Sequence, residues 1–424
     1  MLVPWLAAGI ENPLSNLLVQ SQVHCLAAVA VVLLFAALCG RSHSVFSFSV
    51  LMQAQLLLAL AIASLRATSL SMGALLLAHT FLLSLALGLA ALLFSLRLRP
   101  RSKLRAVATV GVLCLVAFWL NVSVFPFCGL AIVLAPGWRE PGEWRWRFLL
   151  AATMTAAFVC VRLLQSAWPG PAFLGWSSPL DLPAALLQIG QNISGWVLYP
   201  RRVCVILALG LAPWLLQRRL VSPPSARNGL RWTVCFSAVG LLLLTACSSW
   251  AKGTGYTPRL FVVPVCLLLL SAYLPLVESA TWLFRPDFAR GWVVITGTSL
   301  ALVVFSTAVF GFPSPRAARE TVLSTTSSDS EEIRDLGCTH LIGSYWNVWP
   351  RVFHHLATSD APIIWGVTFR SDVTRRLWDG YPQESRVYCA VANDPEVQLS
   401  ASSFKVPPLA QRACKGNICS FTVH

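Results

Sequence analysis

The stretch AHTFLLSLALGLAALLFSLRLRPRSKLRAVATVGVLCLVAFWL, residues 78–120, contains two apolar runs joined by a short basic turn. The turn RLRPRSKLR at 97–105 holds five Lys and Arg residues. Each flanking run is close to the ~20 apolar residues that a helix needs to cross a bilayer. Apolar runs separated by basic loops are typical of proteins whose chain crosses a membrane repeatedly. The stretch therefore predicts a polytopic α-helical membrane protein.

The same pattern extends over most of the chain, which is 56% hydrophobic and 12% charged. We expect about 9–10 transmembrane segments within residues 23–311. The sequence FWLNVSVFPF around Asn121 fits either a tight turn between two short spans or one broken helix. The predicted spans are Val23–Cys39, Val45–Leu65, Ser69–Leu96, Leu104–Leu120, Val122–Pro136, Phe148–Ser166, Val203–Leu216, Trp232–Ser248, Leu260–Val277 and Trp292–Phe310.

The net charge of +15 is confined to the apolar part of the chain. Residues 1–311 carry 21 Lys and Arg against 6 Asp and Glu, a difference of +15. Residues 312–424 carry 11 of each, a difference of zero. Because the excess lies mostly in short loops between apolar runs, it indicates membrane topology rather than a phosphate-binding face. We expect no nucleic-acid partner.

The basic loops orient the chain, because Lys and Arg collect on the cytoplasmic side. The turn at 97–105 is therefore placed in the cytoplasm, together with the loops at 40–44, 137–147, 217–231 and 279–291. All of these loops fall on the cytoplasmic side only if the chain crosses the membrane twice around Asn121. It then leaves an N-terminal segment (1–22), a long loop (167–202) and residues 312–424 outside. The expected location is the inner (cytoplasmic) membrane, with the C-terminal domain extracytoplasmic.

A minority of cations then faces the outer membrane surface: Arg66, Arg201, Arg202, Lys252 and Arg259. The last two flank Tyr256 in the loop WAKGTGYTPRLFVVP. One interpretation is that these side chains reach lipid headgroups from the ends of helices. The other is a binding site for an anion at the outer leaflet, such as a lipid phosphate held by arginine.

The long outer loop contains a predicted helix from Pro183 to about Leu198, with Asp181 as a plausible N-cap. Its apolar residues recur near helical spacing, which suits a helix lying along the membrane interface.

Beyond a polar linker at 312–332, apolar and amphipathic segments alternate through residues 333–424. This alternation predicts a small βαβαβ unit with a parallel sheet, to which VQLSASSFKV and CSFTVH add edge strands. Cys414–Cys419 is the favoured disulfide pair in an extracytoplasmic domain. His354 and His355 are adjacent and have no Cys or carboxylate nearby, so no metal site is predicted.

Several segments resemble membrane glycosyltransferases of the GT-C type, and more closely the bacterial dolichyl-phosphate-mannose protein mannosyltransferase-like group. The resemblance rests on residues 56–96, FWLNVSVFPFCGLAIVLAP, GTGYTPRLFVVPVCLLLLS and LGCTHLIGSYWNVWPRVFHH with IIWGVTFRSDVTRRL. It implies transfer of a sugar from a polyprenyl-phosphate donor to an acceptor at the outer face of the membrane. It also implies that Arg259, at the start of a late span, meets the donor phosphate.

Such enzymes place a catalytic carboxylate in a first outer loop that follows an initial span. Here the expected initial span is absent before the segment containing Glu11, so a shortened relative without activity stays open. Only Glu11 and Asp181, among six carboxylates before residue 312, are predicted to face outward. They are the catalytic candidates, acting as a base or through a divalent metal ion.

Two alternatives to an enzyme are a lipid or solute transporter and a non-catalytic envelope protein whose outer domain binds a partner. Transporters typically show paired half-repeats and buried charges at mid-membrane. No internal repeat is visible in the sequence, and Arg162 is the main charge well inside a predicted span.

Overall fold

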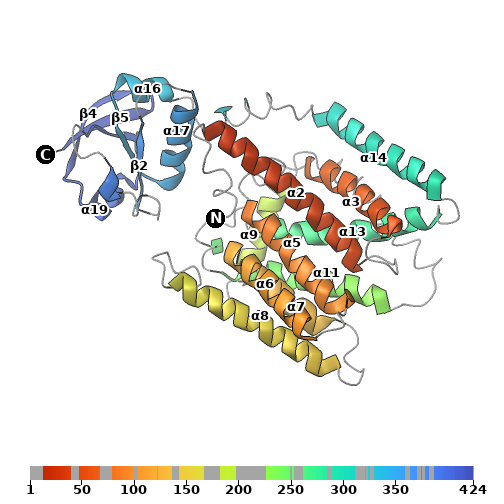
Figure 1. Ribbon diagram of the computed structural model, residues 1–424. Helices are drawn as coiled ribbons and strands as arrows, with labels where there is room; N and C mark the ends of the chain where they lie inside the picture. Colours follow the sequence, from red (N-terminus) through yellow and green to blue (C-terminus); the bar gives the residue numbers. More distant parts are fainter. Residues whose placement is uncertain are drawn as a thin grey trace. The chain divides into compact units, whose positions relative to one another are not determined.

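The computed structural model describes the chain in two compact units (Figure 1). The larger unit contains residues within Val19–Trp168 and Ala172–Gly311, and the smaller contains residues within Phe312–His424. The residues described are 13–39, 47–66, 79–98, 103–121, 123–135, 143–166, 182–196, 226–248, 251–252, 261–283, 288–310, 320, 323–324, 329–358, 363–369, 374, 378–381 and 386–423.

The described part of the larger unit is helical. Nine of the predicted apolar runs coincide with helices, while the run at 203–216 lies outside the described residues. The elements are α2 (Pro13–Cys39), α3 (Phe48–Arg66), α5 (His79–Leu93), the π-helical η2 (Phe94–Leu98), α6 (Lys103–Leu120), α7 (Val124–Leu134), α8 (Glu143–Ser166), α9 (Leu182–Trp196), α11 (Ala226–Ala246), α13 (Val262–Leu283) and α14 (Phe288–Phe310).

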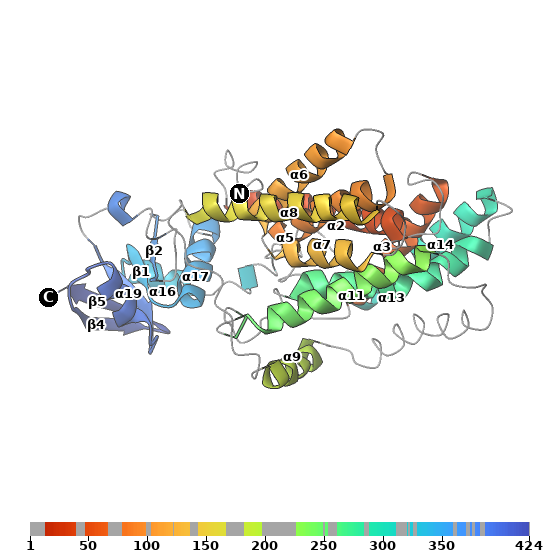
Figure 2. The ribbon, with the colours of Figure 1, turned by 90° about the horizontal axis from the view of Figure 1, so that it is seen from below.

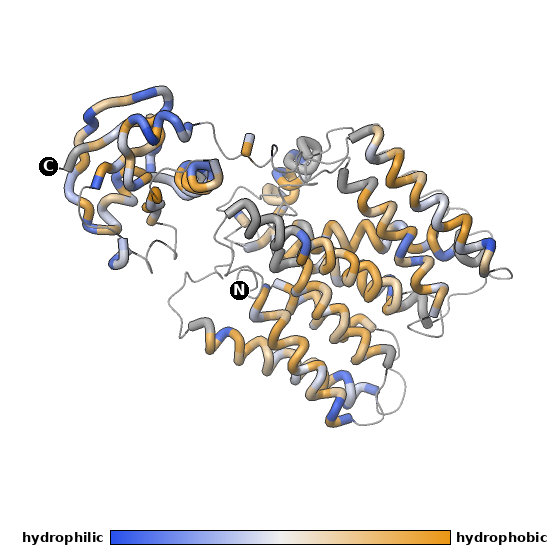
Figure 3. The backbone as a smooth tube through the Cα atoms, turned by 45° about the horizontal axis from the view of Figure 1, so that its top comes forward, coloured by the Kyte–Doolittle hydropathy of each residue, from blue (hydrophilic) through white to orange (hydrophobic). Residues whose placement is uncertain are grey.

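These helices are hydrophobic along most of their length, whether or not they face the interior (Figure 3). Phe148, Leu300 and Phe305 remain more than 60% exposed on helices α8 and α14. By length and composition, two helices among the described residues are able to cross a membrane, Lys103–Leu120 and Glu143–Leu164. In the remaining apolar helices, the apolar parts have 10–17 residues, fewer than the 18 that define a candidate span.

The chain reverses direction at Asn121. Helix α6 ends at Leu120 and α7 begins at Val124, so the sequence FWLNVSVFPF forms a tight turn between two helices. The side-chain oxygen of Asn121 accepts a hydrogen bond from the backbone N–H of Ser123 (2.9 Å). The hydroxyl of Ser84, in the neighbouring helix α5, donates to the carbonyl oxygen of Ala117 at the end of α6 (2.7 Å). The broken-helix alternative is therefore wrong.

Helix α7 is the buried centre of the larger unit and packs against α5, α8 and α11. Two glycines allow this close approach. A Cβ at Gly88 of α5 would meet Val124 and Cys128, and one at Gly240 of α11 would meet Leu130. Since α7 has only 11 residues, it is about 16 Å long, roughly half the hydrocarbon thickness of a bilayer.

The last carbonyl groups of α7 are satisfied by neighbouring helices. The guanidinium of Arg147 in α8 donates to the carbonyl of Ala135, and the hydroxyl of Thr233 in α11 donates to that of Leu134 (3.1 Å). These carbonyls have no partner within their own helix, and burying them unpaired would be costly. The side chains therefore fix the end of α7 as well as its position.

Cross-helix contacts give the relative directions of the helices. Phe48 stacks near Trp292 with ring centroids 4.9 Å apart, and the amide of Gln55 donates to the hydroxyl of Thr296 (3.3 Å). Residue numbers rise together in these pairs, so α3 and α14 are parallel. By contrast α7 and α11 are antiparallel, because Thr233 meets Leu134 while Gly240 meets Leu130.

The smaller unit is an α/β domain built on a five-stranded sheet of order β2-β1-β3-β5-β4. Strands β2 and β3 pair with β1 in parallel, as predicted, and β5 and β4 continue the sheet in antiparallel fashion. The elements are α16 (Ser330–Asp335), β1 (His340–Ile342), α17 (Tyr345–Thr358), β2 (Trp365–Val367), the 3₁₀ turn η5 (Trp378–Gly380), β3 (Tyr388–Val391), α19 (Val397–Ser403), β4 (Leu409–Lys415) and β5 (Ile418–Val423).

Helices cover both faces of this sheet. On one face α16 and α17 pack against Leu341 and Cys389 through side chains such as Val348. On the other face α19 packs against Ile342 and Tyr388. The prediction of an edge strand over VQLSASSFKV is wrong. Residues Val397 and Ala401 lie one helical turn apart and both enter the core, so this segment is helix α19.

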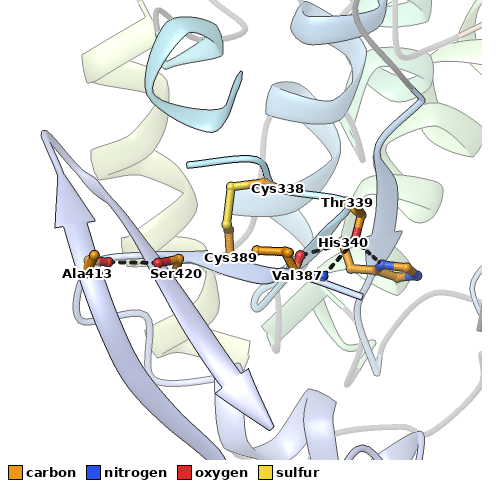
Figure 4. The surroundings of a disulfide bond; sticks show 7 residues. All are labelled: Cys338, Thr339, His340, Val387, Cys389, Ala413 and Ser420. Atoms are coloured by element: carbon orange, nitrogen blue, oxygen red, sulfur yellow. Dashed lines mark hydrogen bonds between the residues drawn. A yellow bond between two sulfur atoms is a disulfide. The ribbon is translucent and has the colours of Figure 1, made fainter. Parts of the chain in front are cut away.

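Two disulfides staple the smaller unit. Cys414–Cys419, the predicted pair, joins β4 to β5, and Cys338–Cys389 joins the segment before β1 to β3 (Figure 4). Their sequence separations are 5 and 51 residues. In the chain-entropy view, loops of these lengths correspond to about 2 and 4 kcal/mol of stabilisation. The second bridge is therefore the larger contributor to the fold.

The packing of α7 on α5 is testable by substituting glycines. An alanine Cβ at position 88 would lie 2.8 Å from Cγ1 of Val124, a buried and branched side chain. We expect Gly88→Ala to destabilise the larger unit by about 1–3 kcal/mol, measured as a lower melting temperature of the detergent-solubilised protein. Gly129→Ala in α7 is the matched control, because a Cβ there meets nothing within 4 Å. Equal melting temperatures for both variants would contradict the close approach.

Candidate functional site

The structure describes part of the predicted site. Lys252 lies in a helical turn after α11 and its side chain is exposed. Arg66 is the last residue of α3, and its side chain lies outside the described part. The remaining predicted site residues, Glu11, Asp181, Arg201, Arg202, Tyr256 and Arg259, also lie outside the described residues. The site is therefore defined here by the elements that flank them.

Helix α9, which follows Asp181 directly, packs against the carboxyl end of α11 and the start of α13. Ala185 and Ile189 of α9 form one buried cluster with Ala246, Ala251 and Phe261. Figure 2 shows α9 beside this end of α11. Two predicted outer segments, far apart in sequence, thus meet at one end of the helical unit. The first contains Asp181 and the second contains Lys252, Tyr256 and Arg259.

The turn that carries Lys252 is held by Ser248. The backbone N–H of Ala251 donates to the Ser248 hydroxyl (3.1 Å), and the N–H of Lys252 donates to the Ser248 carbonyl (3.1 Å). The hydroxyl also donates to the carbonyl of Thr245 at the end of α11 (2.9 Å). Since Ala251 is fully buried in the α9 cluster, the adjacent Lys252 is anchored next to α9.

Helix α9 has three distinct faces. One face, with Ala185 and Ile189, is buried. A second face exposes Leu186 and Leu187, while Gln188 and Gln191 are exposed on the third. A helix that packs on protein while exposing one apolar and one polar flank suits a position at a membrane–water interface. The predicted helix is confirmed with boundaries that differ by one or two residues, and its position at a membrane interface stays a prediction.

The described cations of the larger unit are concentrated at the end that lies opposite helix α9. The turn carrying Lys252 lies where α11 ends and α13 begins. Lys103 and Arg105 start α6, and Arg145 and Arg290 lie near the starts of α8 and α14. Because α6 and α8 both run antiparallel to α7, their starting ends face away from the α9 cluster. Among the described residues, the two ends of the unit therefore differ in their number of cations.

Glu278 lies at the end of the apolar part of α13, Val263–Glu278, next to the predicted span Leu260–Val277. The helix itself continues to Leu283, and Glu278 is only 6% exposed. A carboxyl group inside a helix of the apolar core is unusual, and such groups at membrane depth are often functional. Glu278 lies nearer the end of α13 that is remote from α9, so it does not belong to the candidate site.

A second candidate position is the carboxyl edge of the sheet in the smaller unit. Strands β2 and β3 lie on opposite sides of β1, which creates a switch point between β1 and β3 where parallel sheets commonly bind ligands. Here the carboxylate of Asp394 fills the amino end of α17. It accepts hydrogen bonds from the Ser344 N–H (2.8 Å), the Asn347 side-chain amide (2.9 Å) and the Glu396 N–H (2.9 Å).

The Asp394 interaction is structural. Burial acts to raise the pKa of Asp394, but the hydrogen bonds, led by the one from the Ser344 N–H, lower it more, so the net pKa lies below its ordinary value. Gly343 permits the approach, because a Cβ at its φ of +148° would overlap the carboxylate. The protein's own anion thus occupies the place where a ligand anion would bind. Sequence analysis missed this role of Asp394. The signal in the sequence is a carboxylate that follows shortly after the buried strand β3.

His340 is the most perturbed titratable group of the smaller unit. Burial lowers its pKa to about 4, and Arg386 contributes in the same direction. Its Nδ1 lies 2.9 Å from the Thr339 hydroxyl (Figure 4), and its ring contacts Tyr381 and Tyr388. The histidine is therefore neutral at pH 7 and behaves as a core residue.

No metal site is evident within the described part of the chain, where no group of three or more His, Cys, Asp or Glu side chains is arranged to bind an ion. His354 instead shares a hydrogen bond with the hydroxyl of Ser330 (2.6 Å between Nδ1 and Oγ). No protein-family model matches the sequence, and no curated protein matches it. The assignment of function therefore rests on the residues and their geometry.

The Asp394 contacts predict a pH-dependent stability. Because the folded pKa lies below that of the unfolded chain, the stabilisation is present above about pH 4 and is lost as the pH falls through the folded pKa. We expect Asp394→Asn to destabilise the smaller unit by about 1–3 kcal/mol at pH 7, and the difference from the wild type to shrink in acid. Thermal unfolding of the full-length protein followed by proteolysis measures this. Asp379→Asn, at an exposed carboxylate, is the control, and a pH-independent difference would contradict the argument.

Proposed function

We propose that this protein is a polytopic membrane glycosyltransferase. It transfers a sugar from a polyprenyl-phosphate donor to an acceptor at the outer face of the cytoplasmic membrane. The observation that supports the proposal is the meeting of α9 with the turn at 251–252 and the start of α13. In this packing, helix α9, which begins one residue after Asp181, contacts Ala251 and Phe261, the described residues on either side of the segment that contains Tyr256 and Arg259. We propose that the carboxylate and the cations of these segments act together at the outer face of the membrane.

The proposed chemistry assigns complementary roles to these groups. A carboxylate, Asp181 or Glu11, removes the proton from the acceptor hydroxyl as its oxygen attacks the anomeric carbon. The bond from that carbon to the donor phosphate breaks, and the phosphate leaves with the electron pair. Arg259 and Lys252 stabilise the charge that develops on the phosphate. If a divalent metal ion takes part, the carboxylates are its ligands and it supplies further charge stabilisation.

The helix directions support the crossings that this proposal requires. The ten predicted spans place α3 and α14 in the same direction and α7 opposite to α11, and the cross-helix contacts give the same relations. The short α7 reverses the chain at Asn121 without being long enough to span a bilayer by itself. Because α7 packs against α5, α8 and α11 and its last carbonyls accept hydrogen bonds from α8 and α11, it does not need a lipid-spanning length.

The disulfides support an extracytoplasmic position for the smaller unit. Both bridges among the described residues lie in this unit, while the described free cysteines all lie in the larger one. Disulfides persist in oxidising compartments and are rare in the cytosol. The alternative, a non-catalytic envelope protein, shares this topology and differs in lacking transfer activity.

The catalytic roles are testable with membrane fractions and polyprenyl-phosphate sugars. We expect Arg259→Ala to lower sugar transfer by about 10²-fold or more, because it removes a charge that faces the leaving phosphate. Asp181→Asn and Glu11→Gln, assayed side by side, identify the base as the variant that loses activity. Gln188→Ala, an exposed change on α9, is the control for insertion and expression. Unaltered transfer in all three site variants, or no transfer by the wild type, would favour the non-catalytic alternative.

The topology has its own test. A reporter that is active only outside the cytoplasm, fused after Val423, is expected to be active, because the ten-span count leaves the C-terminus outside. The same reporter placed after Arg101 in the basic turn is the matched control and is expected to be silent. Activity at both positions, or at Arg101 alone, would rule out the proposed orientation and with it the outer-face site.

A further inference from the structure

The two disulfides of the smaller unit differ in their surroundings. Cys338 is 9% exposed and Cys389 is fully buried between the sheet and helices α16 and α17. Cys414 is exposed on strand β4. Its partner Cys419 is 4% exposed and lies directly opposite in the β4–β5 ladder. Only the Cys414 sulfur is therefore on a side chain that solvent reaches freely.

The position of β4 leaves the exposed bridge open to approach. Strand β4 is last in the sheet order, so its outer edge is not paired with another strand of the sheet. Its side chains from Gln411 to Lys415 are all exposed. The ladder register shifts between Gln411 and Ala413, and the Gln411 amide donates to the Cys414 sulfur (3.0 Å). A neutral donor at this sulfur stabilises the negative charge that develops on it when Cys414 is released from a mixed disulfide.

The strands joined by this bridge are also held together by other interactions. The two cysteines are separated by 5 residues, and the strands that they join also share ladder pairs from Leu409–Val423 to Lys415–Ile418. The tip of the hairpin is held independently, because Lys415 forms an ion pair with Asp335 of α16 (2.5 Å). In contrast, Cys338–Cys389 closes a loop of 51 residues through the buried core.

We propose that Cys414–Cys419 is a site of thiol–disulfide exchange with a dithiol, while Cys338–Cys389 is a permanent structural bridge. A thiolate of the dithiol attacks the exposed sulfur of Cys414, forming a mixed disulfide as the Cys414–Cys419 bond breaks. Cys419 leaves as a thiolate and takes up a proton. The second thiolate of the dithiol then attacks the first sulfur of the dithiol, which is bonded to Cys414. Cys414 is released as a thiolate and is also protonated. The dithiol is oxidised by two electrons and the protein disulfide is reduced.

This proposal does not depend on sugar transfer and is tested on the full-length protein in membranes. The protein is incubated with increasing dithiothreitol, the free thiols are alkylated, and the four cysteines are quantified by mass spectrometry. We expect Cys414 and Cys419 to become alkylated at a dithiothreitol concentration at least tenfold lower than Cys338 and Cys389 require. Reduction of both bridges together, or of Cys338–Cys389 first, would overturn the proposal.

Two further measurements separate exchange from unfolding and identify the attacked sulfur. Protease resistance of the smaller unit is expected to persist after selective reduction and in the Cys414→Ser/Cys419→Ser variant. Its loss in either case would show that the bridge is structural. Incubation with the monothiol glutathione is expected to leave a mixed disulfide on Cys414. An adduct confined to Cys419, or none at either cysteine, would overturn the assigned step.

Discussion

The burial of α7 between α5, α8 and α11 is the constraint on which the larger unit depends. A helix of 11 residues gains little stability alone, so packing must hold it in place. Gly88 and Gly240 provide the room, and hydrogen bonds from Arg147 and Thr233 satisfy its final carbonyls. Because the chain reverses at its start, α7 also sets the direction of each helix that follows. The charge difference between the two ends of the unit follows from that reversal.

The candidate site depends on the same arrangement. Helix α9 packs where α11 ends and α13 begins, and both helices derive their direction from the reversal at Asn121. The packing of α9 beside Lys252 therefore depends on how the helices are arranged, rather than on any single residue within the loop.

Sequence periodicity predicted the helices, the parallel β1, β2 and β3 strands and the Cys414–Cys419 bridge, because each depends on local pattern and spacing. It failed for α19. This helix has only 7 residues, so Val397 and Ala401 give a single helical repeat, and the serine-rich sequence VQLSASS resembles a strand. Contacts between distant residues, such as Asp394 with Ser344 and Asn347, lie beyond local pattern because the fold alone brings them together.

The Cys338–Cys389 bridge has a consequence for biogenesis. It joins residues 338 and 389, so it cannot close until every helix that the structure describes in the larger unit has been synthesised. In an oxidising compartment, the core of the smaller unit is therefore completed only after Cys389 has been synthesised. Until then β1 and β3 lack their covalent link, and the nascent domain is at its most vulnerable to proteases during this interval.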